Sequence, residues 1–425
     1  MMENGLHPSL RSVFTEVGSS NGDRWRGLTA CLLAFSLPLA PMVLPLIMVL
    51  MIATFLIDRD VWRTRPLLRV DFFAPALWSV VLLLVHVIGM AWTSNTSFGW
   101  FDVGIKLPLL LLPALTFFPS IRPKGRDAVL LSFCAGNAVA VLLCVALSIG
   151  RAASHEGLGI QEFISSAFSA VLHPSYFAWY LVVSLACWFM GGLKDRVGRI
   201  TGLLFVGVAC IGVLLTGSRM GWITLPLVLV WSLLSCWRDR WTRGVLLGVL
   251  LCSLLGGVLL TATSEHVRYR VVELFSPSGA NAADPFSSAA IRKVTWSAAL
   301  DVGRENMPLG TGTGDVKDEL LLRYKETGAE HAFERQLNAH DQFLQTFAAL
   351  GIPGVLALML MLVLPLLAAL RRGSSHRALK ACILVLVVLN FSVESMLEVQ
   401  AGALFTGWLL WMLWWPAPPL ASSHP

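Results

Sequence analysis

The chain has 425 residues, of which 56% are hydrophobic and only 14% are charged, and its mean hydropathy is +0.70. Soluble globular proteins carry about 25% charged residues, so this composition excludes a soluble enzyme or binding module and indicates a multi-span membrane protein. The net charge of +6 is better explained by basic residues in cytoplasmic loops than by binding to nucleic acid.

Apolar runs along the chain have the length of membrane-spanning helices, which need about 20 residues. The first run, 27–57, would reach roughly 46 Å as one helix, which is too long for an untilted span. Because Pro38, Pro41 and Pro45 interrupt it, we predict two short helices there. The other ten runs lie near 71–91, 101–118, 127–149, 174–191, 199–216, 219–236, 244–262, 342–370, 378–394 and 401–415. The sequence therefore predicts an all-α polytopic membrane protein with about twelve transmembrane helices.

The basic residues give the orientation of these helices. With the N-terminus inside, the cytoplasmic segments hold 20 of the 32 basic residues, whereas the short outer loops and adjoining helix ends keep only Lys106, Arg151 and Arg219. This bias satisfies the positive-inside rule and places both termini in the cytoplasm. Residues 1–262 would then hold nine spans, and residues 340–425 would hold three spans and a short cytoplasmic tail.

Residues 263–339 form a long loop between these two parts, on the outer side of the membrane. Its 77 residues contain no cysteine and include helical patterns at 291–302 and 318–326. We expect a small helical cap on the membrane. A second outer segment, 160–172, places its apolar residues on one helical face, so it either lies in the membrane interface or packs on its neighbours.

Three basic residues near the outer boundary are candidates for binding an anion. Arg219, in "LLTGSRMGW" (214–222), opens a span, where free backbone N–H groups and the positive end of the helix dipole favour phosphate; the alternative is an arginine that reaches for the interface. Lys106, in "FDVGIKLPLLLLP", has Asp102 one helical turn away, so an ion pair is the alternative. Arg292 begins a loop helix and could be an ordinary surface arginine.

His340 is the candidate general base. It lies in "LNAHDQFLQTFAALGIPGVL" (337–356), where the loop meets an apolar helix. We expect Asn338 to cap that helix and His340 to lie in its first turn, where the positive dipole end favours the neutral imidazole that general-base catalysis needs. The alternative is a histidine that only marks the membrane boundary. Glu394, at an outer helix end with Glu398 one turn later, could orient an arginine or a histidine.

Other patterns are weaker candidates. "PLGTGTGD" (308–315) follows no strand and lacks dinucleotide-binding spacing, so we interpret it as a turn, with contact to a substrate phosphate as the alternative. "DRD" (58–60) resembles a metal-binding DxD, but it lies in a short basic loop on the cytoplasmic side. His86 lies inside a span without an obvious partner. No HExxH or Cys/His spacing predicts a metal site, and we expect no metal and no other cofactor.

Taken together, "LLTGSRMGW", "AIRKVTWSAALDV", "ENMPLGTGTGD", "AHDQFLQTFAALGIPGVLALM" and "ESMLEVQAGALF" resemble the O-antigen ligase and polymerase superfamily, which includes ligases of lipid A–core and surface polymers. The order also matches: an arginine opens a mid-chain span, a second lies near a tryptophan in a long periplasmic loop, and the histidine ends the loop. The resemblance extends from 214 to 405. Asp341 departs from the pattern, since the family often has Asn or Ser after the histidine.

The resemblance implies a GT-C-type membrane glycosyltransferase in the bacterial inner membrane, with its active site facing the periplasm. The donor would be a glycan on undecaprenyl diphosphate, and a ligase's acceptor would be a sugar hydroxyl of lipid A–core. Carried over, His340 matches the base, Arg219 and Arg292 match diphosphate-binding arginines, and the reaction is metal-independent and inverting. Membrane lipids would surround the protein.

The leading interpretation is therefore an O-antigen ligase of lipopolysaccharide biosynthesis. The alternatives within the superfamily are an O-antigen polymerase and a protein O-oligosaccharyltransferase. A transporter or flippase of lipid-linked glycans is the alternative from another class. Transporters carry inverted repeats and broken helices at the membrane midplane, whereas this sequence has no visible repeat and its candidate charges gather at the outer face.

Overall fold

The computed structural model describes residues 21–57, 73–115, 123–154, 160–263, 265, 267–268, 288–371 and 376–413, which form helices, turns and loops and no strand. The helices are α2 (Asn21–Ser36), α3 (Leu44–Ile57), α5 (Pro75–Gly89), α6 (Thr96–Lys106), α7 (Pro108–Ala114), α8 (Pro123–Ser154), α9 (Ser165–Phe168), α10 (Pro174–Met190), α11 (Arg199–Leu215), α12 (Arg219–Ser235), α13 (Arg240–Thr263), α15 (Ser288–Glu305), α16 (Val316–Glu326), α17 (Glu330–Glu334), α18 (Gln342–Leu370), α19 (Arg377–Phe391) and α20 (Gln400–Leu413). Short 3₁₀ turns join several of them, including η1 (Pro41–Val43), η4 (Ile160–Phe163), η5 (Leu193–Asp195) and η6 (Met396–Glu398).

The predicted all-α membrane class is confirmed. Five helical segments are long and apolar enough to cross a membrane: Pro75–Trp92, Thr96–Ala114, Gly125–Ser154, Arg240–Thr263 and Gln342–Leu370. Each of the other predicted runs also contains a helix, but these are shorter, so the number of twelve spans stays a prediction. The predicted break in the first run is present, because α2 ends at Ser36 and α3 begins only at Leu44.

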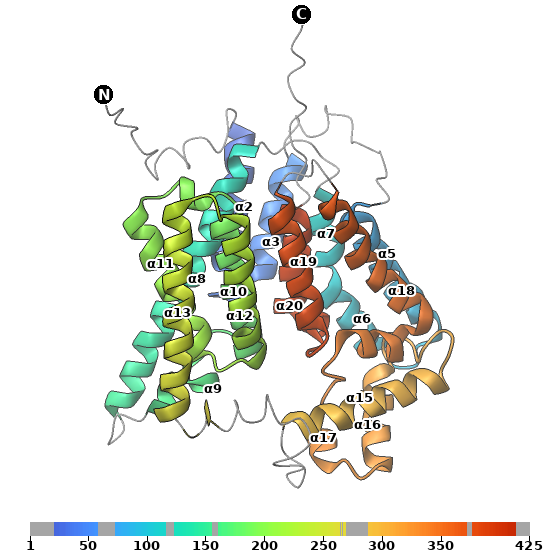
Figure 1. Cartoon of the computed structure of the whole chain (residues 1–425). Helices are drawn as coiled ribbons and strands as arrows, with labels where there is room; N and C mark the ends of the chain where they lie inside the picture. The colour runs from blue at the N-terminus through green and yellow to red at the C-terminus, as the bar shows by residue number, and fades with distance from the viewer. Residues whose placement is uncertain are drawn as a thin grey trace, which may run out of the picture.

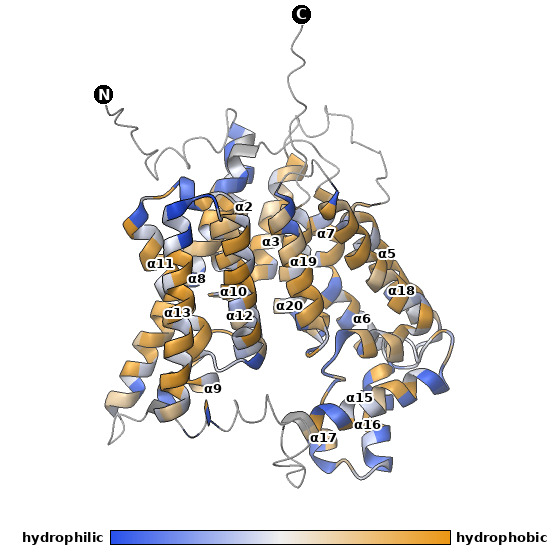
Figure 2. Ribbon diagram, viewed as in Figure 1, coloured by the Kyte–Doolittle hydropathy of each residue, from blue (hydrophilic) through white to orange (hydrophobic). Residues whose placement is uncertain are grey.

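The apolar helices form one bundle, and α15, α16 and α17 lie together at one end of it (Figure 1). The bundle is mostly hydrophobic along its length, whereas its ends and the three cap helices carry hydrophilic residues (Figure 2). Within the described residues 288–339, the segment predicted to be helical contains three helices, and its place as a cap on the outer side of the membrane stays a prediction. It is attached through α15, which packs on α18. Residues 269–287 lie outside the described part of the chain.

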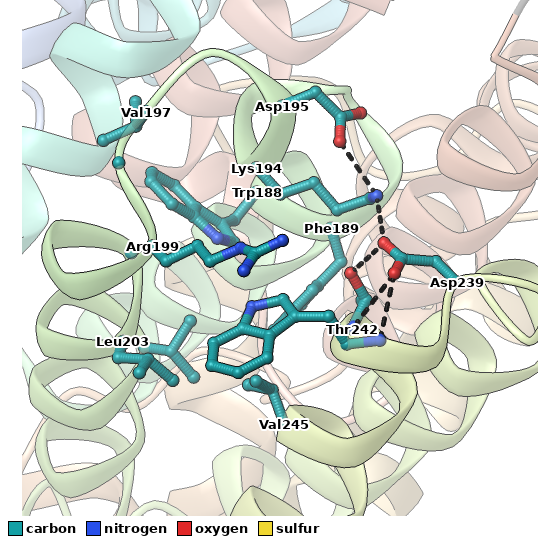
Figure 3. A pocket seen from close by; sticks show the side chains of 14 residues that line it. Trp188, Phe189, Lys194, Asp195, Val197, Arg199, Leu203, Asp239, Thr242 and Val245 are labelled. Carbon is teal, nitrogen blue, oxygen red and sulfur yellow. Dashed lines mark hydrogen bonds and ion pairs between the residues drawn. The ribbon is translucent and has the colours of Figure 1, made fainter. Parts of the chain in front are cut away.

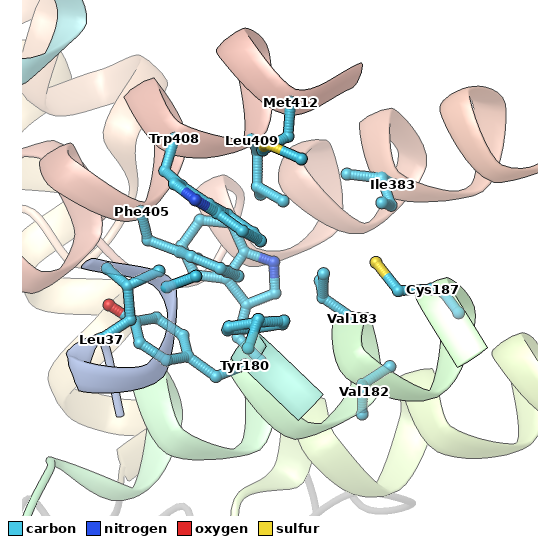
Figure 4. Packing of buried hydrophobic residues seen from close by; sticks show 14 of the residues in the cluster. Leu37, Tyr180, Val182, Val183, Cys187, Ile383, Phe405, Trp408, Leu409 and Met412 are labelled. Atoms are coloured by element: carbon cyan, nitrogen blue, oxygen red, sulfur yellow. The ribbon is translucent and has the colours of Figure 1, made fainter. Parts of the chain in front are cut away.

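The centre of the bundle is an aromatic cluster between α10 and α20 (Figure 4). Every residue from Ala401 to Leu413 is buried, as expected for a helix that is hydrophobic on all sides. Tyr180 packs against Phe405 with ring centroids 3.9 Å apart and the rings tilted by 35°, and its hydroxyl donates to the carbonyl of Ala401 at 2.8 Å. This contact fixes α20 against α10 and so positions the turn that precedes α20.

The helix that follows His340 is broken at Gly351, which has φ 58° and ψ −146°. The break frees the carbonyls of Ala348 and Ala349, since the N–H of Ile352 turns to Pro308 and Pro353 has none. Two N–H groups of the "PLGTGTGD" segment donate hydrogen bonds to these carbonyls: Thr311 donates to Ala348 at 3.0 Å and Gly312 to Ala349 at 2.9 Å. The glycine-rich segment is thus a turn that satisfies a helix break.

The amphipathic segment 160–172 is not the single helix we expected. It divides into η4 and α9 at Ser165, whose φ is 62°. Ile164 and Phe168 are buried, so the apolar face packs on neighbouring helices. Because of this division, Ser165 and Ser166 line a cavity of the bundle.

Candidate functional site

A polar cavity of about 210 Å³ lies at the cap end of the bundle, where α10 and α12 begin and α19 ends. Arg219, Arg292 and Glu394 line it, together with His173, Ser218 and Asn390. Two of the three residues predicted to carry the chemistry therefore share one cavity. The third, His340, contacts the cavity through Glu394.

Arg219 reaches the cavity because a tight turn ends α11 and starts α12. Gly217 has φ 61°, and Ser218 caps α12 by accepting the N–H of Gly221 at 3.2 Å. Arg219 is thus the first residue of α12, half-buried at its positive end. A fixed guanidinium beside the N-terminus of a 17-residue helix suits an anion such as diphosphate.

Arg292 comes from the cap and lies on the other side of the same cavity. Its Nε donates to the carbonyl of Val393 at 3.4 Å, in the turn after α19. One helical turn later, Trp296 donates its indole N–H to the carbonyl of His340 at 3.3 Å. The helix α15 therefore holds the second arginine and the segment before α18 in one arrangement.

His340 and Glu394 form a hydrogen-bonded pair, with Nδ1 of the imidazole 2.8 Å from Oε1 of the carboxylate. Their side chains are 26% and 13% exposed, so the pair can be reached from outside. Burial alone would raise the pKa of Glu394, but the hydrogen bond with His340 and the charges of His340, Arg292 and His173 outweigh it and lower the pKa. An ionised Glu394 fixes the orientation of the ring through its contact with Nδ1.

The local structure around His340 differs from the expectation. Asp341, not Asn338, caps α18, since its carboxylate accepts the N–H of Leu344 at 2.8 Å. Asn338 instead accepts the N–H of His340 at 3.0 Å. His340 itself precedes the helix in a left-handed conformation with φ 49°, so the prediction of a first-turn position was wrong. Burial raises the pKa of Asp341, and the N–H groups of Leu344 and Phe343 oppose this rise.

Lys106 does not line the cavity. It is fully buried, forms a short ion pair with Asp102 and lies 3.2 Å from Oε1 of Glu398. The pairing with Asp102, given above as the alternative for Lys106, is present. Gln342 links this cluster to the turn before α20, because its side chain donates to Glu398 at 3.3 Å and accepts the N–H of Leu397 at 2.6 Å.

The weaker candidates lie elsewhere. His86 is buried, with Nδ1 2.9 Å from the carbonyl of Leu82, and its own carbonyl accepts the hydroxyl of Thr313 at 2.6 Å. The "PLGTGTGD" segment therefore packs on α5 and does not line the cavity. Residues 58–60 lie outside the described residues. In the part of the chain that the structure describes, no three His, Cys, Asp or Glu side chains are grouped as metal ligands.

A second cavity, of about 190 Å³, lies at the opposite end of the bundle between α10, α11 and α13 (Figure 3). The charged side chains that line it form contacts that stabilise the fold. Asp239 caps α13 through the N–H of Thr242 at 3.3 Å and pairs with Lys194 at 2.9 Å. Arg199 lies over the ring of Trp241, 4.8 Å from its centroid. We assign this cavity to helix capping and loop closure.

Residues 202–359 match the family model described as O-antigen ligase. This match confirms the resemblance to the O-antigen ligase superfamily. It includes Arg219, Arg292 and His340, whereas Glu394 lies beyond it. The family that this model describes consists of glycosyltransferase-like ligases and polymerases.

A protein of Haemophilus influenzae described as uncharacterised is 23% identical to this chain over 225 residues. The aligned part covers 50% of this chain and 55% of that protein. The chain thus spans about half the length of this relative, and the similarity adds no activity to the family match.

Sequence reasoning missed His173, which immediately precedes α10 and lines the cavity. The available signal was an ionisable side chain followed by proline at the outer end of a span, in "VLHPSYF". Its charge is one of those that lower the pKa of Glu394. Asn390 and the serines of 165–166 gave no comparable signal, because single polar residues near helix ends are common.

Proposed function

We propose that this protein is an O-antigen ligase, which transfers a glycan from undecaprenyl diphosphate to a sugar hydroxyl of lipid A–core. The observation that carries the proposal is one cavity lined by two arginines and by the carboxylate that orients a histidine. This set provides what the reaction needs: cations for a diphosphate and a base for a hydroxyl.

In the proposed reaction, Nε2 of His340 takes the proton of the acceptor hydroxyl as its oxygen attacks the anomeric carbon. The bond from that carbon to the diphosphate breaks on the opposite face, so the configuration inverts. The electron pair leaves on the diphosphate, whose added charge is stabilised by Arg219, Arg292 and the N-terminus of α12. Because diphosphate is a good leaving group, no strong acid is required to protonate it.

Glu394 acts in this scheme through His340. Its carboxylate accepts a hydrogen bond from Nδ1–H and stabilises the imidazolium that forms during transfer, as carboxylates do for catalytic histidines elsewhere. Gln342 and Glu398 act one step further away by tying the start of α18 to the turn before α20. In this proposal Lys106 is a structural partner of Glu398 and not a ligand of the donor.

The proposal includes a site on the outer face of the inner membrane. It assigns twelve spans in a GT-C-type arrangement, with 1–262 and 340–425 in the membrane and 263–339 as the periplasmic part. The distribution of basic residues supports this orientation, because Lys194 and Arg199 lie between α10 and α11, at the ends of these helices away from the cap. Cysteines introduced at Ser278 and Ser374, both outside the described residues, would test it; labelling at Ser374 alone from the periplasm would contradict it.

The function is tested by analysing lipopolysaccharide from a strain that lacks the gene. A missing ligase leaves polymerised glycan on the lipid carrier and an uncapped lipid A–core. A missing polymerase instead leaves core that carries a single repeat unit, and that result would reassign the protein within its superfamily. A pool of lipid-linked glycan unable to reach the periplasm would support the transporter alternative.

A further inference from the structure

Trp296 lies on α15 and is the only tryptophan in residues 263–339 of the sequence. It is 36% exposed, whereas Ala298 and Ala299, two and three residues later, are buried where α15 packs on α18. Its indole N–H donates to the carbonyl of His340 at 3.3 Å. The ring is therefore held beside the histidine and is still partly open to the outside.

The hydrogen bond alone does not explain an indole at this position, because a glutamine could donate to the same carbonyl. An indole adds a large rigid surface at a low cost in conformational entropy, which is why tryptophan is common in binding sites. The face of the ring carries the negative part of the π-system, and the C–H groups of a sugar ring pack well on such a plane. The exposed part of Trp296 thus suits a sugar.

The order of residues along α15 matches the order of groups in the proposed displacement. Arg292 lines the cavity assigned to the diphosphate, and Trp296 lies roughly 6 Å further along the helix, against the residue that carries the base. In an inverting transfer, the acceptor oxygen and the leaving diphosphate lie on opposite faces of the anomeric carbon. The base must be within hydrogen-bond reach of that oxygen. The acceptor sugar therefore belongs on the His340 side of the donor, where Trp296 is exposed.

We propose that the exposed face of Trp296 is a stacking platform for the sugar ring that carries the acceptor hydroxyl. This inference rests on the proposed function, which makes the acceptor a sugar. Trp296 binds the ring and directs its hydroxyl toward His340, and it takes no part in the proton transfer. The sugar of the donor is the competing occupant, and separate kinetic constants for donor and acceptor distinguish the two.

The test separates the ring of Trp296 from its hydrogen bond. Trp296→Phe keeps an aromatic face without the N–H, Trp296→Gln keeps an N–H donor without the face, and Trp296→Ala keeps neither. Phe333→Ala is the matched control, because Phe333 is another exposed aromatic residue of the cap, at 41%. The full-length protein in nanodiscs is titrated with deacylated core oligosaccharide in the absence of donor, and saturation-transfer NMR measures the Kd. The KM values for lipid A–core and for the lipid-linked donor are then measured on the same variants.

We expect Trp296→Ala and Trp296→Gln to raise the Kd of the oligosaccharide and the KM for lipid A–core about tenfold, the effect of losing one aromatic contact. Trp296→Phe should stay within about threefold of the wild type, and Phe333→Ala should equal it. The KM for the donor should be the same in all variants. The proposal is overturned if Trp296→Phe loses as much affinity as Trp296→Ala, because the hydrogen bond to His340 would then be the cause. A rise in KM for the donor in place of the acceptor would also overturn it and assign the ring to the donor sugar.

The two measurements keep this proposal distinct from the proposed function. If the wild type binds the oligosaccharide through Trp296 but transfers no glycan, the function fails and the platform stands. If the wild type transfers glycan while Trp296→Ala keeps its Kd for the oligosaccharide and its KM for lipid A–core, the platform fails and the function stands.

Discussion

Two carboxylates four residues apart, Glu394 and Glu398, have opposite surroundings. Glu394 faces the cavity, where it pairs with a histidine and where two arginines also lie. Glu398 points to the interior, 3.2 Å from Lys106. The two carboxylates are equally exposed, at 13% and 14%, so the difference lies in their partners: the side chain of His340 is 26% exposed and that of Lys106 only 1%.

Charged residues that look alike in the sequence can therefore have different roles: some are placed to take part in the reaction, and others stabilise the fold. A buried ion pair is strongly destabilising when one partner is removed, because the other charge stays in a medium that cannot solvate it. A pair that opens on a cavity can instead exchange protons with a substrate. We therefore expect changes at Glu394 and its partners to alter turnover, and changes at Lys106 and its partners to alter stability.

The largest effect on turnover is expected for His340→Ala. Removing a general base lowers the rate by about 10²–10⁴-fold, while expression and donor binding should stay near those of the wild type. Single-turnover transfer at saturating donor measures this. His331→Ala, in the cap helix α17, is the control and should transfer normally. A wild-type rate for His340→Ala would make His340 a boundary residue and direct attention to Asp341.

Arg219→Ala and Arg292→Ala should have the next largest effect and a different signature. Each removes charge-assisted contacts worth about 1.5–3 kcal/mol, so donor affinity and turnover should each fall by roughly 10–100-fold. Arg219→Lys should recover only part of this, since an ammonium lacks the planar two-point contact. Lys293→Ala, an exposed neighbour of Arg292, is the control. Unchanged donor affinity in both alanine variants would exclude them from the diphosphate site.

The residues themselves pointed to Arg219 and His340, because each stands at a helix boundary, where a charge is conspicuous. Arg292 alone had the pattern of a surface arginine, and it joined the set only through the resemblance to the superfamily. It also predicted the break between α2 and α3, since three prolines interrupt that run. It could not decide between the two roles of Lys106, because the i, i+4 pairing with Asp102 and a role in binding have the same local pattern.

The pairing of Glu394 with His340 depends on a contact across 54 residues, and local pattern carries no such information. The cap of α18 was misassigned for a related reason. Asn338 and Asp341 are both good N-cap residues, and the choice between them depends on the left-handed turn at His340. That turn is held from outside by Trp296 of the cap.

Lys106→Met should change stability and leave the turnover of the folded protein nearly intact. It leaves Asp102 and Glu398 buried without their cation, which costs about 3–5 kcal/mol. Thermal unfolding in detergent measures the loss. The triple change Lys106→Met with Asp102→Asn and Glu398→Gln removes all three charges and should recover most of it, and Lys325→Met, at an exposed position, should have no effect. A folded Lys106→Met protein with weakened donor binding would instead restore Lys106 to the binding site.

The smallest effect is expected on the free energy of unfolding at acid pH, and it tests Glu394 directly. The pKa of Glu394 lies below its ordinary value of 4.5, so the folded state binds a proton there less readily than the unfolded chain does. The stability from its contacts is then fully present above pH 4.5 and is lost as the pH falls through the lowered pKa. The difference in unfolding free energy between wild type and Glu394→Gln should shrink over that acid range and be constant near neutrality. Glu330→Gln, which removes an exposed carboxylate of α17, should run parallel to the wild type throughout. If Glu394→Gln also runs parallel, the carboxylate is not held ionised by His340 and Arg292, and the contrast with Glu398 loses its electrostatic basis.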